Sequence, residues 1–337
     1  MYEEHFGVQR PPFRMSPDTE FLFLTEGHRE ALAGLIYSIV QRKGFTVLVG
    51  EAGTGKSTLL QRVLETVPAQ TSLVTNPRLS PAEFLEYALL DFGLEDLPAS
   101  KAQRLMKLQN FLLEAAGRQE AAVLIVDEAH TMSPEVLEEI RLLTNLETPE
   151  GKLLQIVLAG QDELSQLLNR DDLRQLKQRV AVRLNLRPLT ASQAKSYIGH
   201  RWKVAGGEEP PFDDGAYSAI NLYSRGVPRL INVVADNALL TAFSAGEACV
   251  TGEHVHGAAR DLDLVRRLPE PTPPADGRRA APVAKQEAPP AGAVPGLYFE
   301  NGILFRSAPP SVEREITPEQ RGFFRRLFGS SKGEVHE

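Results

Sequence analysis

Cysteine, long apolar runs and excess basic charge are scarce or missing in this sequence. The single cysteine, Cys249, excludes an intrachain disulfide and is typical of a reducing compartment. No window of about 18 uninterrupted apolar residues occurs, so we expect no segment to span a bilayer. Residues 1–4 lack the basic, apolar start of a signal peptide. These absences predict a cytoplasmic protein.

The charge balance sets a second limit. A formal charge of −7 argues against broad, sequence-independent coating of nucleic acid, which requires a basic face, but it leaves room for a local basic stripe. The hydrophobic fraction of 42% and the charged fraction of 24% are those of a soluble globular protein. The length of 337 residues is enough for two ordinary domains and a tail.

Composition changes sharply near Leu268. Of the 24 prolines, 11 lie between Pro269 and Pro318, together with Ala, Gly and Glu and few large apolar residues. Such a stretch buries too little apolar surface to offset the entropy lost on ordering, so we expect 267–316 to be a flexible, disordered Pro-rich linker. The folded body is therefore expected to end at about residue 266.

Short apolar runs alternate with helical patterns in the body of the chain. The runs predicted as strands are 45–49, 71–75, 122–126, 153–159 and 182–186. Runs that are apolar throughout predict a parallel sheet covered on both faces, as in doubly wound α/β folds. From Thr190 onward the pattern is helical and opens with a capping box that ends at Gln193. We therefore expect an α/β domain at 1–189 and a smaller helical domain at 190–266, before the linker and a tail at 317–337.

Residues 50–57 match the phosphate-binding pattern G-x-x-x-x-G-K-[ST] between a predicted strand and a predicted helix. The residues expected to contact a nucleotide are Gly50, Glu51, Ala52, Gly53, Thr54, Gly55, Lys56, Ser57 and Thr58. The glycines let the backbone wrap with its N–H groups inward, where they hold phosphate at a helix N-terminus. We expect Lys56 to neutralise the β- and γ-phosphates and Ser57 to hold Mg²⁺. A chance glycine-rich turn is the alternative, and the strand–loop–helix context argues against it.

The apolar run 122–126 ends in two carboxylates, Asp127 and Glu128, which supply the partner element of this site. We expect Asp127 to orient Mg²⁺ beside Ser57, and Glu128 to polarise the water that attacks the γ-phosphate. ATP and Mg²⁺ are therefore the predicted cofactors. The run Asp-Glu-Ala-His also matches one helicase class, but the body has room for only one of that class's two motor domains. For His130 two interpretations stay open, contact with the nucleotide or a neighbouring subunit, and no role in the site.

Further motifs lie on both sides of the phosphate loop. They are Phe6-Gly7, Pro12-Phe13, Pro17-Asp18, Phe21-Leu22, the run His28 to Leu32, Gly160-Gln161 with Glu163-Leu164, Leu176 to Arg179, and Gly226 to Arg229. In this combination the sequence resembles the AAA+ ATPases, and among them the general secretion pathway branch called ExeA or GspA, to which MshM and TniB-type ATPases are related. The resemblance covers about residues 1–266. It implies a P-loop NTPase fold with a helical lid and Mg²⁺-dependent ATP hydrolysis.

The resemblance also implies three roles around the γ-phosphate. Gln161 follows a predicted strand and resembles the polar sensor that positions the attacking water. Arg179 resembles the arginine finger that one subunit presents to its neighbour's nucleotide, with Arg183 and Arg174 as alternatives. Arg229 follows a proline suited to the first turn of a helix, where a cation opposes the helix dipole unless an anion lies between them. It resembles the lid sensor that contacts the γ-phosphate.

The tail at 317–337 carries the pattern of a short basic amphipathic helix. Helical spacing groups Phe323, Phe324, Leu327 and Phe328 on one side and leaves Arg321, Arg325 and Arg326 to face water or anionic lipid. Three interpretations stay open: a membrane anchor, a docking peptide for a partner groove, and a tail that folds back on its own body or has no role. Secretion-type relatives typically continue through a transmembrane helix into a peptidoglycan-binding region, and we expect neither here.

Together these features predict a cytoplasmic AAA+ ATPase, with possible peripheral contact at the inner membrane through the tail. We expect it to self-associate into a ring or filament and to act with a protein partner. Its ATP hydrolysis would drive assembly or regulation of an envelope machine of the secretion, pilus or exopolysaccharide type. The alternatives are a DNA-associated regulator of the transposition type and a nucleotide-sensing scaffold with negligible turnover.

Overall fold

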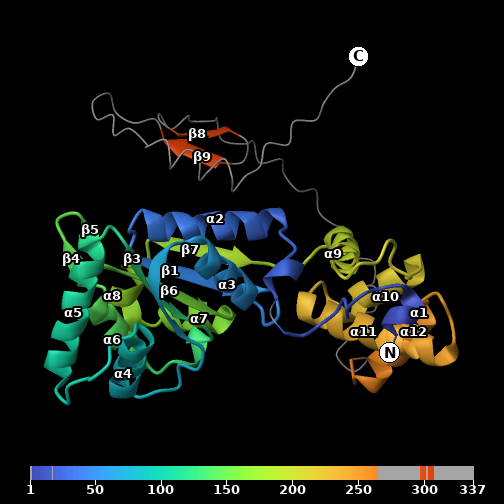
Figure 1. The fold of residues 1–337 in the computed structure, drawn as a ribbon, viewed down its shortest axis with the longest axis horizontal. Coiled ribbons are helices and arrows are strands. Elements are labelled where there is room, and N and C mark those ends of the chain that lie inside the picture. The colour runs from blue at the N-terminus through green and yellow to red at the C-terminus, as the bar shows by residue number, and fades with distance from the viewer. Residues whose placement is uncertain (1, 17, 265–296, 301–302, 307–337) are drawn as a thin grey trace, which may run out of the picture. The chain divides into compact units, whose positions relative to one another are not determined.

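The computed structural model describes residues 2–16, 18–264, 297–300 and 303–306 (Figure 1). They belong to two units, Met1–Glu270 and Pro271–Glu337, and each unit is described by itself. The predicted amphipathic helix of the tail lies outside the described residues.

A five-stranded parallel sheet forms the centre of the first unit. Its strands are β1 (Phe45–Gly50), β2 (Ala69–Val74), β3 (Ala121–Val126), β6 (Leu154–Gly160) and β7 (Val182–Leu186), in the order β2-β3-β6-β1-β7. All five predicted strands are present, with ends within two residues of the predicted ones. Every residue of β1 and β6 is buried, as expected for inner strands covered on both faces. The predicted doubly wound α/β fold is confirmed.

Helices cover both faces of this sheet. Against one face lie α2 (Glu26–Val40) and α3 (Lys56–Thr66). Against the other lie α4 (Pro81–Asp91), α5 (Lys101–Gly117), α6 (Pro134–Leu143), α7 (Asp162–Leu168) and the short α8 (Arg174–Lys177). Single turns at η1 (Thr19–Phe21), η2 (Ala129–Thr131) and η3 (Asp171–Leu173) and a small hairpin of β4 (Glu147–Thr148) and β5 (Gly151–Lys152) complete this half of the unit.

Helix starts follow the local signals. The Ser80 side chain accepts the N–H of Glu83, whose carboxylate accepts the N–H of Ser80, so the predicted capping box opens α4. The Ser133 side chain accepts the N–H of Val136 and so caps α6, whose first turn contains a proline.

The lid is a bundle of four helices, α9 (Ala191–Val204), α10 (Asp214–Ser224), α11 (Pro228–Ala245) and α12 (Gly252–Asp261). The capping box of Thr190 and Gln193 opens α9, as predicted. The connection from the sheet is fixed at Leu189, whose N–H donates to the carbonyl of Gly226 at 2.8 Å. Gly226 has φ +76°, and a Cβ there would lie 1.9 Å from the Leu189 oxygen, so only glycine fits.

The N-terminal segment packs with the lid, which differs from the predicted domain boundary. The apolar core of the lid helices includes Tyr2, Val8, Phe13 and Phe21. The short helix α1 (Glu3–Phe6) lies beside the lid helices (Figure 1). The chain then crosses to α2 on the sheet. The α/β domain therefore takes its first residues from about α2 onward.

The second unit contains a two-stranded antiparallel hairpin, β8 (Leu297–Glu300) and β9 (Ile303–Arg306), with Leu297 opposite Arg306. It lies within the segment predicted to be a structureless linker. The dipeptide Asn-Gly between two short apolar runs is a strong hairpin signal. The prediction of a linker rested instead on the high proline content of the surrounding sequence. Among the helices of the described residues, none has the length and apolar character needed to cross a bilayer.

Candidate nucleotide site

The phosphate loop lies between the end of β1 and the start of α3, as the sequence predicts. Gly53 and Gly55 have φ of +82° and +98°, and Gly55 is the N-cap of α3. These left-handed residues allow the chain to turn tightly onto the helix N-terminus, where unpaired N–H groups favour an anion.

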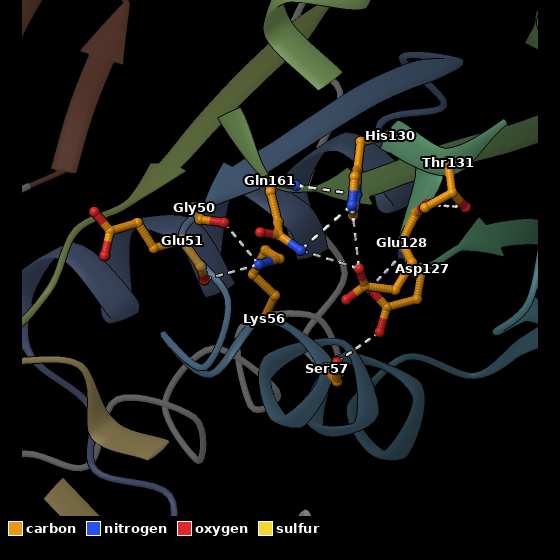
Figure 2. Close-up of polar contacts among 9 residues, drawn as sticks. All are labelled: Gly50, Glu51, Lys56, Ser57, Asp127, Glu128, His130, Thr131 and Gln161. Atoms are coloured by element: carbon orange, nitrogen blue, oxygen red, sulfur yellow. Dashed lines mark hydrogen bonds and ion pairs between the residues drawn. The ribbon is translucent and has the colours of Figure 1, made fainter. Parts of the chain in front are cut away.

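Lys56 is the buried cation of this loop, with only 4% of its surface exposed. Its Nζ donates to the carbonyls of Gly50 at 2.7 Å and Glu51 at 3.0 Å (Figure 2). Burial lowers the pKa of Lys56, while the carboxylates of Glu128 and Asp127 act in the opposite direction. The two carbonyls hold the ammonium in place over the loop.

His28 supports the same loop from α2, a role that its place in a sequence motif did not predict. The carbonyl of Thr54 can only accept, so Nε2 of His28, which lies 3.1 Å from it, carries the ring hydrogen. In the neutral ring Nδ1 is then an acceptor and takes the hydrogen of the Thr25 hydroxyl at 2.6 Å, while that hydroxyl accepts the His28 N–H at 3.3 Å. Burial lowers the pKa of His28, which favours this neutral form.

The predicted metal ligands Ser57 and Asp127 lie together. The Ser57 hydroxyl donates to Oδ2 of Asp127 at 2.5 Å, and the N–H of Glu128 donates to Oδ1 at 2.9 Å (Figure 2). In the described part of the chain, no group of three or more His, Cys, Asp or Glu is arranged so that it could hold a metal ion by itself. This donor set fits Mg²⁺, which keeps several waters and takes other ligands from substrate phosphates.

Glu128, His130 and Gln161 meet at the carboxyl edge of β3 and β6 (Figure 2). The Gln161 amide nitrogen lies 3.4 Å from Oε2 of Glu128, and the Gln161 main-chain N–H donates to Nδ1 of His130 at 3.4 Å. Nε2 of His130 lies 3.6 Å from the same carboxylate oxygen. The structure thus brings Gln161 to the predicted base, and adds His130.

The lid reaches the phosphate loop through Arg229. Its main-chain N–H donates to the carbonyl of Gly53 at 3.2 Å. A Cβ on Gly53 would lie 2.6 Å from Cβ of Arg229, so the lid and the phosphate loop are in direct contact. Arg229 thus stands at the loop, at the start of α11, as predicted.

The three candidate finger residues lie elsewhere. Arg179 donates to the Thr144 hydroxyl at 2.7 Å, and Arg183 donates to the Ser165 hydroxyl at 2.7 Å. Arg174 is exposed at the start of α8. Arg174, Arg179 and Arg183 do not line the cleft at the phosphate loop of their own chain.

That cleft has a volume of about 410 Å³. From the α/β domain it is lined by His28, 52–58 and Glu128. From the lid it is lined by Leu189, Tyr197, Arg201, Pro228, Arg229 and Asn232, and from the N-terminal segment by 14–16, Asp18 and 21–23. The sequence did not predict the N-terminal wall or Arg201, because these contacts join residues about two hundred positions apart.

Comparison with known proteins agrees with this geometry. Residues 39–168 match the AAA domain family. The chain is 39% identical over 269 residues to General secretion pathway protein A of Aeromonas hydrophila, an alignment of 79% of this chain and 49% of that protein. The chain thus spans about half the length of this relative.

Two solved structures share the fold. The Aeropyrum pernix ORC2 protein in its ADPNP–ADP complexes has a TM-score of 0.55 at 17% identity, over 75% of this chain and 72% of that one. The Aeropyrum pernix ORC1 protein in complex with DNA also has a TM-score of 0.55, at 20% identity, over 77% and 73%. At these identities the likeness concerns the fold alone.

Proposed function

Since this chain belongs to the AAA+ ATPases of the general secretion pathway protein A family, we propose that it binds ATP with Mg²⁺ and hydrolyses it. The observation that carries the proposal is the convergence of Lys56, Ser57, Asp127 and Glu128 on one phosphate loop. These four residues come from two segments about 70 positions apart, and their meeting supports a single site.

Nucleotide would lie in the cleft between the loop and the lid. The N–H groups of 50–58 would hold the phosphates, with Lys56 supplying the positive charge. Ser57 and Asp127 would hold Mg²⁺, which supplies charge neutralisation at the β- and γ-phosphates when bound.

Glu128 is the proposed base. Its carboxylate lies at the loop and accepts from Gln161, so it can take a proton from a water that Gln161 helps to place. Arg229 would contact the γ-phosphate from the lid, because it already stands against Gly53. Closure of the lid would then depend on the nucleotide.

Arg179 is the proposed finger, acting on a neighbouring subunit's nucleotide. It is absent from the cleft of its own chain, which is what a residue acting in a second subunit requires. Within its own chain the guanidinium is bonded to Thr144 at the C-terminal end of α6, a bond that it would exchange for the phosphate of a neighbour's nucleotide. Arg183 and Arg174 remain the alternatives. We propose that the active form is a ring or filament.

The relative's name associates that protein with general secretion. For this chain we propose a cytoplasmic role, with peripheral contact at the inner membrane, in the assembly or regulation of an envelope machine. The DNA-associated regulator is the less favoured alternative, because the chain is acidic overall. A scaffold with negligible turnover is the other, and kinetics separate it from the proposal.

The test is ATP turnover per subunit across a wide range of protein concentration. We expect turnover to rise with concentration, and Arg179→Ala to abolish the rise. Arg170→Ala is the matched control, because this exposed arginine pairs with Asp172 of its own chain. Glu128→Gln should retain ATP binding and lose at least about 100-fold in turnover.

Three outcomes would contradict the proposal. Turnover near zero at every concentration would favour the scaffold. Full turnover in Glu128→Gln would mean that Glu128 is not the base. An unchanged rise of turnover with concentration in Arg179→Ala would mean that another arginine is the finger.

A further inference from the structure

His130 is the residue at this site for which the phosphate-loop chemistry gives no role. We propose that His130 is a positioning residue for ATP hydrolysis, which holds Gln161 through Nδ1 and Glu128 through Nε2. The proposal rests on the proposed function, because it concerns the same reaction. It assigns His130 to the catalytic step and not to the binding of nucleotide.

The hydrogen bonds fix which ring nitrogen carries the hydrogen. The main-chain N–H of Gln161 points at Nδ1 of His130, with a nitrogen–nitrogen distance of 3.4 Å. A nitrogen that accepts this bond has no hydrogen of its own, so the neutral ring carries its hydrogen on Nε2. His130 is therefore an acceptor toward the start of α7 and a donor on its opposite edge.

The donor edge faces the catalytic carboxylate. Nε2 of His130 lies 3.6 Å from Oε2 of Glu128, and the Gln161 side-chain nitrogen lies 3.4 Å from the same oxygen (Figure 2). The two nitrogens are 3.3 Å apart, and with the ring hydrogen on Nε2 both are donors, so the acceptor that they share is Oε2 of Glu128, which lies within 3.6 Å of each. These distances are long, as catalytic hydrogen bonds often are before a substrate is bound.

The backbone around His130 is closely fitted, so the ring has little freedom. Its side chain is 14% exposed. Glu128 has φ +52°, a left-handed conformation that a glutamate rarely adopts, and its carbonyl accepts both the N–H and the hydroxyl of Thr131. A Cβ on Gly160 would lie 3.2 Å from the main-chain nitrogen of His130. The turn after β3 is thus pressed against the end of β6, and His130 bridges the two.

His130 is not placed to contact the nucleotide in the cleft. The cleft is lined by the phosphate loop, Glu128, the lid and the N-terminal segment, and His130 is not among the lining residues. Loss of the imidazole should therefore change the orientation of Glu128 and Gln161 and leave the phosphate contacts in place. The signature of this role is a change in kcat with little change in KM or in ADP affinity.

Two amide variants separate the two edges of the ring. In His130→Gln the terminal nitrogen reaches the position of Nε2, so the donor to Glu128 is retained. In His130→Asn the oxygen reaches only the position of Nδ1, so the acceptor for Gln161 is retained and the donor is lost. His130→Ala removes both. His256→Asn, at an exposed histidine of the lid helix α12, is the matched control.

The experiment measures kcat, KM and ADP affinity for wild type and these variants, with thermal melting to confirm the fold. We expect kcat to fall about tenfold or more in His130→Ala and His130→Asn, to recover at least about threefold in His130→Gln, and to stay unchanged in His256→Asn. KM and ADP affinity should stay within about twofold of wild type.

The proposal is overturned if His130→Ala turns over at the wild-type rate, if His130→Asn equals or exceeds His130→Gln, or if the loss lies in ADP affinity. A wild-type protein that binds ATP and does not turn it over at any concentration contradicts the proposed function itself. That outcome is distinct, because it is seen before any variant is compared.

Discussion

The two walls of the nucleotide cleft are built in different ways. On the α/β wall, polar side chains from short motifs bond to one another and to nearby backbone, as Lys56 does with Gly50 and Ser57 with Asp127. On the lid wall, residues far apart in the sequence are held by packing and by bonds to backbone carbonyls. The α/β wall thus carries the residues proposed for ATP hydrolysis, and the lid wall adds residues that cover them.

Arg201 shows how the lid wall is held. Only 6% of its surface is exposed, and its guanidinium donates to the carbonyls of Pro12 at 2.5 Å and Arg14 at 3.3 Å. The guanidinium carbon also lies 4.5 Å from the centre of the Phe21 ring. Asn232 on α11 donates to the same Arg14 carbonyl at 3.5 Å. The N-terminal segment is therefore part of the lid in its bonding as well as in its apolar core.

The largest effect should come from the α/β wall. Lys56→Ala removes the buried cation of the phosphate loop, and we expect ATP affinity to fall at least about 100-fold, or about 3 kcal/mol. Calorimetric titration of ATP measures the change. Lys195→Ala, at an exposed lysine paired with Asp214, should bind as wild type. ATP affinity within a few fold of wild type in Lys56→Ala would mean that the loop is not the phosphate site.

An intermediate effect should come from the lid wall, and in a different quantity. Arg201→Met removes the donor to the carbonyl of Pro12 and one of the two donors to the carbonyl of Arg14, so we expect the free energy of unfolding to fall by about 2–4 kcal/mol. Urea denaturation measures it, with Arg260→Met on α12 as the exposed control.

Arg201→Lys sharpens the result, because it keeps the charge and loses the planar fork. An Arg201→Lys variant as stable as wild type would show that charge, and not the pattern of donors, holds the N-terminal segment.

The smallest effect should be a dependence of stability on pH at His28. Its pKa is lowered by burial, so the unfolded chain binds a proton at a higher pH than the folded one. Stability from this residue is present above about pH 6.5 and is lost as pH falls below that value.

His28→Gln should flatten the acid side of the stability profile measured by urea denaturation. His200→Gln is the comparison, since burial also lowers the pKa of that histidine and it does not line the cleft. If only His200→Gln flattens the profile, the phosphate loop does not carry the effect.

The elements that local sequence signals specify were predictable, and those that depend on distant contacts were not. The five strands, the capping boxes at Ser80 and Thr190 and the phosphate loop are each encoded within a few residues. The pairing of Ser57 with Asp127 followed from two motifs whose chemistry requires each other.

The N-terminal wall of the cleft was missed because its bonds join Arg14 to Arg201 and Asn232, and nothing near Arg14 encodes that separation. The support of Thr54 by His28 was missed for the same reason. The bridging position of His130 depends on how closely β6 approaches the turn after β3, which only the packed structure fixes.

The bond between the Arg229 N–H and the Gly53 carbonyl has a consequence for the timing of the cycle. It joins the lid to the loop proposed to hold the phosphates, so a lid that swung open would withdraw a hydrogen bond from the loop itself. Release of the product nucleotide and relaxation of the loop would then be a single event. The residence time of ADP, and with it the pace of repeated turnover, would be set by how often this one peptide contact breaks.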